Sequence, residues 1–547
     1  MDPYRGHGHG HHPLSMAIII DQLKIPLDAD ESSLKAFAAR ALAVAEHDIV
    51  SLSVKRVSLD ARKKNEIGFS YTVEASLSPR DEARLVKKGL ARLAGPREPR
   101  RIILGEAPLH APVVVAGLGP AGLFAGYTLA KYGYRPILLE RGRDTHARKG
   151  DVERFWAGGP LNEESNVMFG EGGAGAFSDG KLTTRIKDER AGEVVDTLAR
   201  FGAPEEIRVM AKPHIGTDRL AGTVARIRQE IQALGGEVRF ETRLDGLEAA
   251  DGALRAVRVS HAGREERLPC AALILATGQG AADTYEMLLA AGFELVPKPF
   301  AAGVRIEHPR AVIDAAQYGA HINHPRLGAA EYHFAAQAGD RGVYTFCMCP
   351  GGTVVASSSS REQVVVNGMS HYARNGENSN AAIVVQVDAR DFLPGPLGGL
   401  RFRQELERAA FVAGGGDYRA PACMAGDFLR KRTPQGFSSV RPTYMPGVKP
   451  VDLGRLLPGF MAEGVREGLR TFGKKLKGFG MDEAVITAVE SRTSAPVRIV
   501  RDEAGEATRM RGVYPTGEGA GYAGGIVSAG VDGMRAAERI MARFRPD

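Results

Sequence analysis

The stretch that decides the fold is Val113-Val-Val-Ala-Gly117-Leu-Gly119-Pro-Ala-Gly122. Its first four residues are all apolar, which predicts a strand of a parallel sheet with both faces covered. Its three glycines have the G-x-G-x-x-G spacing and lead into a predicted helix over residues 121–132. The first glycine permits a tight turn, the second lets the backbone approach a pyrophosphate, and the third lets the helix pack closely on the sheet.

The predicted helix starts at Ala121, directly after Pro120, and a helix N-terminus offers N–H donors to a phosphate. The next predicted strand, residues 136–140, ends on Glu140, which stands 18 residues after Gly122. That spacing fits a carboxylate that binds a ribose hydroxyl pair, and Arg141 beside it is a further cofactor-binding candidate. The sequence therefore predicts a dinucleotide site. A glycine-rich turn that binds no ligand is the alternative.

Two later segments favour FAD over NAD, because they resemble flavoproteins of the glutathione reductase type. The buried strand 273–276 and the turn Thr277-Gly278 resemble the strand and turn that close the FAD domain of those proteins. Leu244 lies in the position where the backbone of those proteins holds adenine. This resemblance implies FAD as the cofactor.

The C-terminal stretch 512–526 resembles the last strand, turn and helix of the same flavoproteins. The resemblance places Gly517 and Glu518 at the ribityl chain, and it places Gly525 and Ile526 beside the pyrimidine edge of the flavin. A helix N-terminus at that edge would stabilise negative charge on the reduced ring. A glycine-rich loop that only caps a helix is the alternative.

A second glycine-rich stretch runs from Asn166 to Leu182 and contains Gly172, Gly173, Ser178 and Lys181. So many glycines in one loop indicate close approach of the backbone to a flat or phosphorylated group. We expect contact with the flavin, and a purely structural loop is the alternative. Lys181 is a candidate to reach flavin N1 or a substrate anion, and a solvated lysine is the other interpretation.

Several motifs together resemble one family, the uncharacterised bacterial FAD-dependent dehydrogenases, also called NAD(FAD)-utilising dehydrogenases. The resemblance implies FAD, a fold of the glutathione reductase type and an FAD-dependent oxidoreductase, but no particular substrate. The motifs that carry it are residues 170–182, 344–352, 367–370, 490–494 and 514–526.

The predicted fold class is α/β with α+β insertions. It comprises a Rossmann-like FAD-binding domain, an inserted substrate domain and an N-terminal ferredoxin-like βαββα unit. Residues 102–104 are a candidate closing strand for that unit, and residues 237–240, 254–260 and 264–268 are predicted to form a β-meander. The predicted parts are an expression leader (1–15), the N-terminal unit (16–105), the first FAD-binding part (106–294), the insertion (295–495) and the last FAD-binding part (496–547).

Candidates for catalysis are few. Cys347 and Cys349 stand two apart on a predicted strand and so share a face, as a redox pair or as inert buried thiols. His333 is a third candidate, and Lys181 a fourth. No second strand–GxGxxG–helix unit follows, so NADH or NADPH is expected only as a transient electron donor. Neither cysteine has enough neighbouring ligands in sequence to predict a metal site.

The composition fits a folded cytoplasmic enzyme. The 547 residues carry a net charge of +7 and only four cysteines, which favours a reducing compartment. No apolar run is long enough to span a membrane. We expect a small-molecule substrate, anionic if the basic residues of the insertion face it, and the sequence makes no prediction of the oligomeric state. The alternatives are a flavoprotein that acts on RNA through its N-terminal unit, against which the near balance of charge there argues, and a non-catalytic flavin module that docks a partner.

Overall fold

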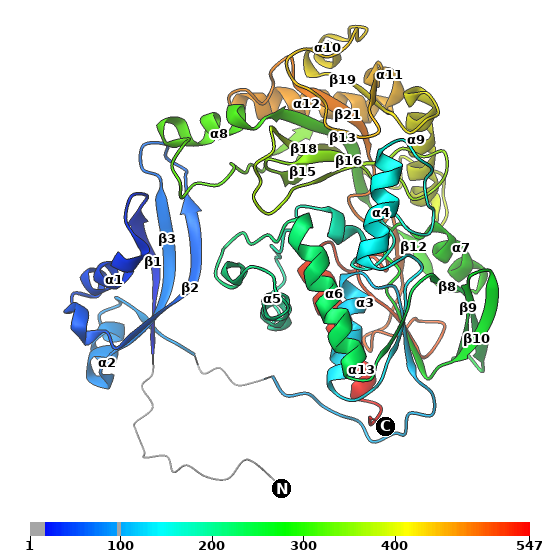
Figure 1. Ribbon diagram of the computed structural model, residues 1–547, viewed down its shortest axis with the longest axis horizontal. Coiled ribbons are helices and arrows are strands. Elements are labelled where there is room, and N and C mark those ends of the chain that lie inside the picture. Colours follow the sequence, from blue (N-terminus) through cyan, green and yellow to red (C-terminus); the bar gives the residue numbers. More distant parts are fainter. Residues whose placement is uncertain (1–16, 96–99, 547) are drawn as a thin grey trace. The chain divides into compact units, whose positions relative to one another are not determined.

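The computed structural model describes residues 17–95 and 100–546 and shows a mixed α/β protein with parallel and antiparallel sheets (Figure 1). The predicted leader, 1–15, lies outside the described residues. The chain divides into two compact units. The first is Met1–Arg101 with Arg208–Ala211, and the second is Ile102–Ile207 with Lys212–Asp547. In the described part, no helix is long and apolar enough to cross a membrane.

The first unit is a four-stranded antiparallel sheet in the order β2-β3-β1-β4. The second helix of this unit ends before Gly89, which takes a positive φ of 70°, and the chain then returns to pair with β1. Residues 102–104 form no strand, so that prediction was wrong; β4 already occupies the free edge of β1. The elements are β1 (Ile18–Pro26), α1 (Leu34–Leu42), β2 (Ser51–Asp60), β3 (Gly68–Ser76), α2 (Pro79–Lys87) and β4 (Arg92–Leu93).

A five-stranded parallel sheet forms the centre of the second unit, in the order β23-β11-β5-β6-β7. Parallel strands bring their carboxyl ends to one edge of the sheet, and in such sheets ligands bind at that edge. The strands are β5 (Val113–Ala116), β6 (Ile137–Leu139), β7 (Glu237–Arg239), β11 (Ala272–Leu275) and β23 (Val513–Pro515).

Both faces of this sheet are covered, as the continuous apolar run predicts. Val113 and Val115 pack under the helices of one face, and Val114 and Ala116 pack under the other. In Figure 1 the helices α3, α6 and α13 lie together, and the meander lies across the sheet from them. The first face carries α3 (Pro120–Lys131), α5 (Arg190–Arg200), α6 (Thr217–Ala233) and α13 (Ile526–Met541); the second carries β8 (Thr242–Ala250), β9 (Ala253–His261), β10 (Arg264–Pro269) and α7 (Ala282–Ala290).

One strand of the predicted meander was assigned wrongly. β7 pairs with β6 at the edge of the parallel sheet, and β8 is the first strand of the meander, in the order β10-β9-β8. Both segments alternate apolar and polar residues. Alternation shows which face a side chain takes but not which strand is the neighbour.

A second, seven-stranded sheet is built wholly from residues between Phe300 and Glu490, inside the predicted insertion. The short strands β12 (Leu295–Pro297) and β22 (Val497–Ile499) pair where the chain enters and leaves this region. The sheet order is β14 (Ala335–Ala338), β15 (Arg341–Cys349), β18 (Asn378–Val387), β13 (Phe300–Pro309), β21 (Val485–Glu490), β19 (Ala420–Met424) and β20 (Val448–Pro450). The remaining elements include β16 (Thr353–Ala356), β17 (Val366–Met369), α4 (Thr145–Trp156), α8 (Arg310–Tyr318), α9 (Gly398–Gly414), α10 (Ala425–Arg430), α11 (Leu453–Leu456) and α12 (Gly459–Lys475).

Candidate functional site

A cavity of about 390 Å³ opens at the carboxyl edge of the parallel sheet. Its wall includes Ala116 after β5, Leu139 at the end of β6 and Ala276 after β11. Cys347 and Glu490, from the second sheet, line it as well. The volume lies within the range of small-molecule and cofactor sites.

The three glycines of the first loop have different roles. A Cβ on Gly117 would stand 2.4 Å from the Ala276 carbonyl oxygen, and a Cβ on Gly122 would stand 1.8 Å from the Gly117 carbonyl oxygen. These two glycines therefore permit packing of the loop and the helix. Gly119 meets only the Gly173 Cα, at 3.8 Å, and its backbone lines the cavity.

The cavity wall fits a dinucleotide, because it leaves bare backbone where side chains would intrude. A Cβ on Gly278 or Gly524 would meet nothing within 4 Å, and one on Gly525 only the Ser528 Oγ at 3.9 Å. All three glycines line the cavity. The N-terminus of α3 lies at the same wall, with Pro120 and Ala121 in its first turn. Backbone N–H groups at such a helix end are suited to a pyrophosphate.

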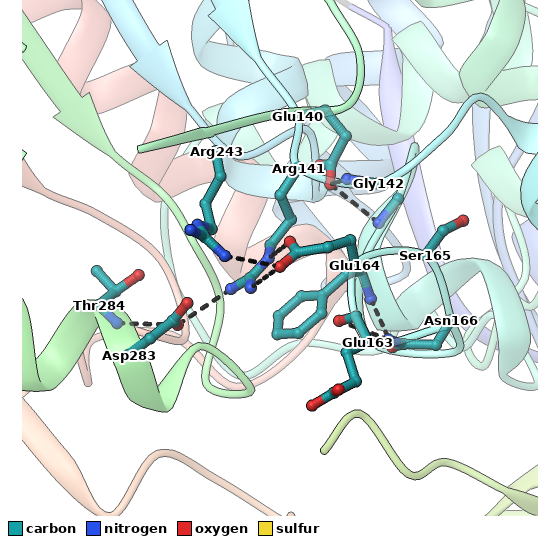
Figure 2. A network of polar contacts seen from close by, with 12 residues as sticks. Glu140, Arg141, Gly142, Glu163, Glu164, Ser165, Asn166, Arg243, Asp283 and Thr284 are labelled. Carbon is teal, nitrogen blue, oxygen red and sulfur yellow. Dashed lines mark hydrogen bonds and ion pairs between the residues drawn. The ribbon is translucent and has the colours of Figure 1, made fainter. Parts of the chain in front are cut away.

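Glu140 is buried and holds three loops together, and Figure 2 shows its contact with one of them, at Gly142. Its Oε2 accepts a hydrogen bond from the Leu118 N–H at 2.9 Å, and its Oε1 accepts from the N–H groups of Gly142 and Gly170, each at 2.9 Å. The carboxylate also lines the cavity. Contact with a ribose stays a prediction. The structure adds that this side chain fixes the glycine loop that precedes it.

Beside Glu140, the cavity wall is a network of ion pairs, shown in Figure 2. Arg141 donates to both oxygens of Glu164, at 2.7 and 3.1 Å, and to Asp283 at 3.0 Å. Arg243 donates to the same Glu164 at 2.8 Å and immediately precedes Leu244, which also lines the cavity. Both guanidinium groups are therefore already paired with carboxylates.

The glycine-rich loop is held from behind by Arg148, a residue of α4 that is completely buried. Its guanidinium donates to five backbone carbonyl oxygens, those of Asn166, Val167, Gly170, Glu171 and Gly173, at 2.7–3.3 Å. The loop thereby presents Gly173 and Ser178 to the cavity. Nothing in the local sequence around Arg148 indicated this role.

Elsewhere on the cavity wall, two carboxyl groups have raised pKa values. Burial raises the pKa of Glu518 to about 7, although Lys298 nearby and a 3.1 Å hydrogen bond from Gln279 act in the opposite direction. Burial also raises the pKa of Glu490, against the pull of Arg305, whose guanidinium donates to it at 2.9 Å. Arg305 and Glu490 are both buried. Perturbed carboxyl groups in a cavity are typical of functional sites.

The cysteines do not keep the regular alternation that the strand predicts. The register of β15 against β18 shifts between Phe346 and Cys349, and Cys347 has a φ of +42°. Cys347 lines the cavity, whereas Cys349 is fully buried and does not. The prediction that the two residues share a face of a regular strand was therefore wrong, because a bulge interrupts the strand.

Most predicted cofactor residues meet at this one cavity. Gly122, Gly172 and Gly517 do not line it; the Gly172 N–H donates to the Leu118 carbonyl and the Gly517 N–H to Asp532. His333 is exposed and lies outside the wall. The predicted residues that line the cavity are Gly117, Gly119, Pro120, Ala121, Glu140, Arg141, Gly173, Ser178, Lys181, Leu244, Thr277, Gly278, Cys347, Glu518, Gly525 and Ile526.

Sequence reasoning missed Arg305, Gln279 and Arg492. Arg492 lines the cavity and binds Glu407 through two nitrogens, at 3.0 and 2.8 Å. Glu490 and Arg492 belong to the motif 490–494 that carried the family resemblance, and this was the one available signal. Their partners lie 80 residues or more away in the sequence, so spacing alone does not reveal them.

Comparison with known proteins gives a match of residues 299–493 to the domain family "FAD-dependent protein, C-terminal domain-like" and of residues 17–76 to a domain of unknown function. Among solved structures, a geranylgeranyl bacteriochlorophyll reductase-like protein from Thermoplasma acidophilum is 12% identical, with 80% of this chain and 79% of that one covered and a TM-score of 0.34. A flavin-dependent brominase is 11% identical, with 80% and 81% covered and a TM-score of 0.35. Likenesses this weak carry no conclusion about fold or function.

A full-length relative is more informative. A protein of Clostridium beijerinckii, described as an uncharacterized protein, is 46% identical over 534 residues, which are 97% of this chain and 99% of that one. The match to a domain family of FAD-dependent proteins confirms the prediction that FAD is the cofactor. The chain therefore belongs to the same family as the Clostridium beijerinckii protein, and its cofactor is FAD.

Proposed function

We propose that the protein is an FAD-dependent oxidoreductase that passes a hydride between the flavin and a small organic molecule. One observation carries this proposal: a single cavity collects the carboxyl ends of parallel strands, two glycine loops and the turn before the last helix. The same arrangement supports a fold of the glutathione reductase type and a dehydrogenase or reductase reaction. The low cysteine content, with all four cysteines free, supports a cytoplasmic location.

In this proposal, different parts of the cavity wall bind different parts of FAD. The N-terminus of α3 with Gly119 takes the pyrophosphate, and Glu140 takes the ribose. The N-terminus of α13, at Gly525 and Ile526, stabilises negative charge on the reduced ring. Burial raises the pKa of Glu518 to about 7, so at neutral pH about half of these carboxyl groups hold a proton that they can donate in a hydrogen bond. The bound flavin supplies the acceptor or donor of the hydride.

The charges in the wall favour an uncharged substrate over an anionic one. Among the described residues, the arginines that line the cavity are Arg141, Arg243 and Arg492, and each is already paired with a carboxylate. The Lys181 ammonium donates to the Met348 carbonyl. The basic residues of the insertion on which the anionic expectation rested do not line the cavity: Arg430, Lys431, Arg432, Arg441, Arg466 and Arg470.

The N-terminal unit follows the order β1-α1-β2-β3-α2-β4, which supports the ferredoxin-like assignment. Its basic residues are partly neutralised, since Lys55 pairs with Glu74 at 3.2 Å and Lys63 with Glu66 at 3.0 Å. This gives little support to the alternative of an RNA-acting flavoprotein. A filter-binding measurement with tRNA at low salt tests it, and saturable binding there would revive it.

The test of the proposed function is an anaerobic absorbance titration of the purified holoprotein with NADH, NADPH and dithionite in turn. Bleaching of the flavin by a nicotinamide supports a reductase, with the nicotinamide as transient donor. Bleaching by dithionite and by an organic substrate, but not by either nicotinamide, supports a dehydrogenase. A protein with no flavin spectrum even after addition of FAD would overturn the proposal.

A further inference from the structure

The bulge of β15 at Cys347 and Met348 is an unusual piece of backbone. Cys347 is not a glycine, yet its φ is +42°, a conformation that few residues with a side chain adopt. Such strained residues persist only where the surroundings hold them, and they gather at functional sites. The bulge lies at the cavity, because Phe346 and Cys347 both line it.

Two cations hold this bulge in place. Arg305 donates to the Cys347 carbonyl oxygen through two nitrogens, at 3.0 and 3.2 Å, and the Lys181 ammonium donates to the Met348 carbonyl oxygen. Arg305 is in turn fixed by Glu490 at 2.9 Å and by Asn380 at 2.8 Å. The strained conformation of Cys347 is thus held by specific hydrogen bonds from side chains around the cavity.

The bulge also brings the Cys349 thiol against Cys347. The Cys349 thiol donates a hydrogen bond to the Cys347 carbonyl oxygen, with the Sγ 3.4 Å from that oxygen. The Cys349 side chain lowers the pKa of the Cys347 thiol to about 7, with burial opposing it and Arg305 and Lys181 adding to it. The Cys347 side chain and burial raise the pKa of Cys349. A thiolate beside a protonated thiol is the state from which disulfides form and exchange.

The other two cysteines provide the contrast. Cys270 and Cys423 are buried, and neither lines the cavity. Burial raises the pKa of each to about 12, so both stay protonated. They have the properties of inert core thiols. Cys347, by contrast, lines the cavity in which FAD is proposed to bind.

We propose that Cys347 and Cys349 are a dithiol–disulfide couple that exchanges two electrons with the FAD in this cavity. The inference rests on the proposed function, because it needs FAD in the cavity. In the forward direction the Cys347 thiolate and the Cys349 thiol form one S–S bond and release one proton and two electrons. The oxidised FAD takes up both electrons and the proton, so the step balances without another reactant.

The test is an anaerobic dithionite titration of the holoprotein combined with a thiol map. If the couple exists, oxidised wild-type protein takes up two electrons for the FAD and two more for the disulfide. The variant Cys349→Ser takes up the two for the FAD alone. The control variant Cys423→Ala keeps the wild-type stoichiometry. Cys349 does not line the cavity, and a serine hydroxyl can donate to the Cys347 carbonyl oxygen as the thiol does, so the flavin absorbance should stay.

The thiol map is read on the tryptic peptide Gly342–Arg361, which contains both cysteines. We expect that this peptide carries no alkyl group when oxidised protein is denatured and alkylated, and two when dithionite-reduced protein is treated in the same way. Flavin-replete wild type that takes up only two electrons, with both cysteines alkylated in the oxidised state, would overturn the couple and leave the proposed function intact. Wild type without flavin absorbance would instead overturn the proposed function, and the couple with it.

Discussion

Two regions of the cavity wall are rich in charge, one at the end of β6 and one at the end of β21, and they differ in how far their charged groups are exposed. At the β6 end, Arg141 and Arg243 share Glu164, whose side chain is 42% exposed, and Asp283 is 49% exposed. At the β21 end, the Arg305 and Glu490 side chains are 0% and 3% exposed. Water screens the first network, whereas burial strengthens every interaction in the second. The β6 end is therefore suited to hold a bound group in a fixed orientation, and the β21 end to change the proton affinity of its own buried groups.

The largest effect is expected for Arg305→Met at the β21 end. Removing this guanidinium leaves Glu490 buried without its partner and frees the carbonyl of Cys347. Breaking a buried ion pair in this way costs about 3–5 kcal/mol. The midpoint of urea denaturation, compared with that of the wild type, measures the loss. A shift equal to that of Arg141→Met would contradict the contrast between the two ends.

Glu518 should make the stability of the apoprotein depend on pH. Its pKa in the folded protein is about 7 against an ordinary value of 4.5, so between these pH values the folded state binds the proton more tightly than the unfolded chain does. The stabilisation is complete below pH 4.5 and is lost as the pH rises through about 7, by up to about 3 kcal/mol. Melting temperatures at the two ends of this window measure it. The variant Glu518→Gln should lose this part of the pH dependence, and an unchanged profile would remove Glu518 as its source.

At the β6 end, Glu140→Ala should weaken FAD binding by about 1.5–3 kcal/mol, the range for hydrogen bonds to a charged group. The loss combines the proposed ribose contact with loosening of the loop at Leu118 and Gly170. A fluorescence titration of apoprotein with FAD measures it. Glu140→Gln keeps an acceptor oxygen and should bind FAD with intermediate affinity. Unchanged affinity in both variants would mean that the ribose lies elsewhere.

The smallest effect is expected for Arg141→Met. Its ion pairs with Glu164 and Asp283 are partly exposed, and pairs of this kind contribute about 1 kcal/mol or less. The urea midpoint should therefore move little, and addition of 0.5 M salt, about the concentration that shortens the Debye length to under 5 Å, should shrink the difference further. A loss as large as that at Arg305 would show that this network is less screened than its exposure indicates.

Much of the β6 end could be predicted from the sequence because its signals are local. The run from Val113 to Gly122 fixes a strand, a turn and a helix through residues that are neighbours in the chain, and Glu140 follows at a set spacing. The stretch 512–526 is equally compact, and α13 begins at Ile526 at the end of it. The local structure of such segments can be predicted without knowledge of the residues that pack around them.

The β21 end could not be predicted in the same way. Arg305, Glu490 and Cys347 come from three strands that are distant in sequence, and only the order of strands in the seven-stranded sheet brings them together. The bulge at Cys347 changes the direction of a side chain that regular alternation would have placed otherwise. Alternation likewise did not distinguish β7 from β8, since pairing partners are chosen by the fold as a whole.

The hydrogen bonds of Arg148 also bear on how this site can change among members of the family. A stretch as rich in glycine as 166–182 has few side chains with which to define its own shape, and a free chain of this kind loses much entropy on becoming ordered. The Arg148 guanidinium on α4 fixes the shape of this loop, because it donates hydrogen bonds to five of the loop's carbonyl oxygens. The shape of the loop is thus encoded outside the loop, so the loop and Arg148 should be gained or lost together as family members diverge.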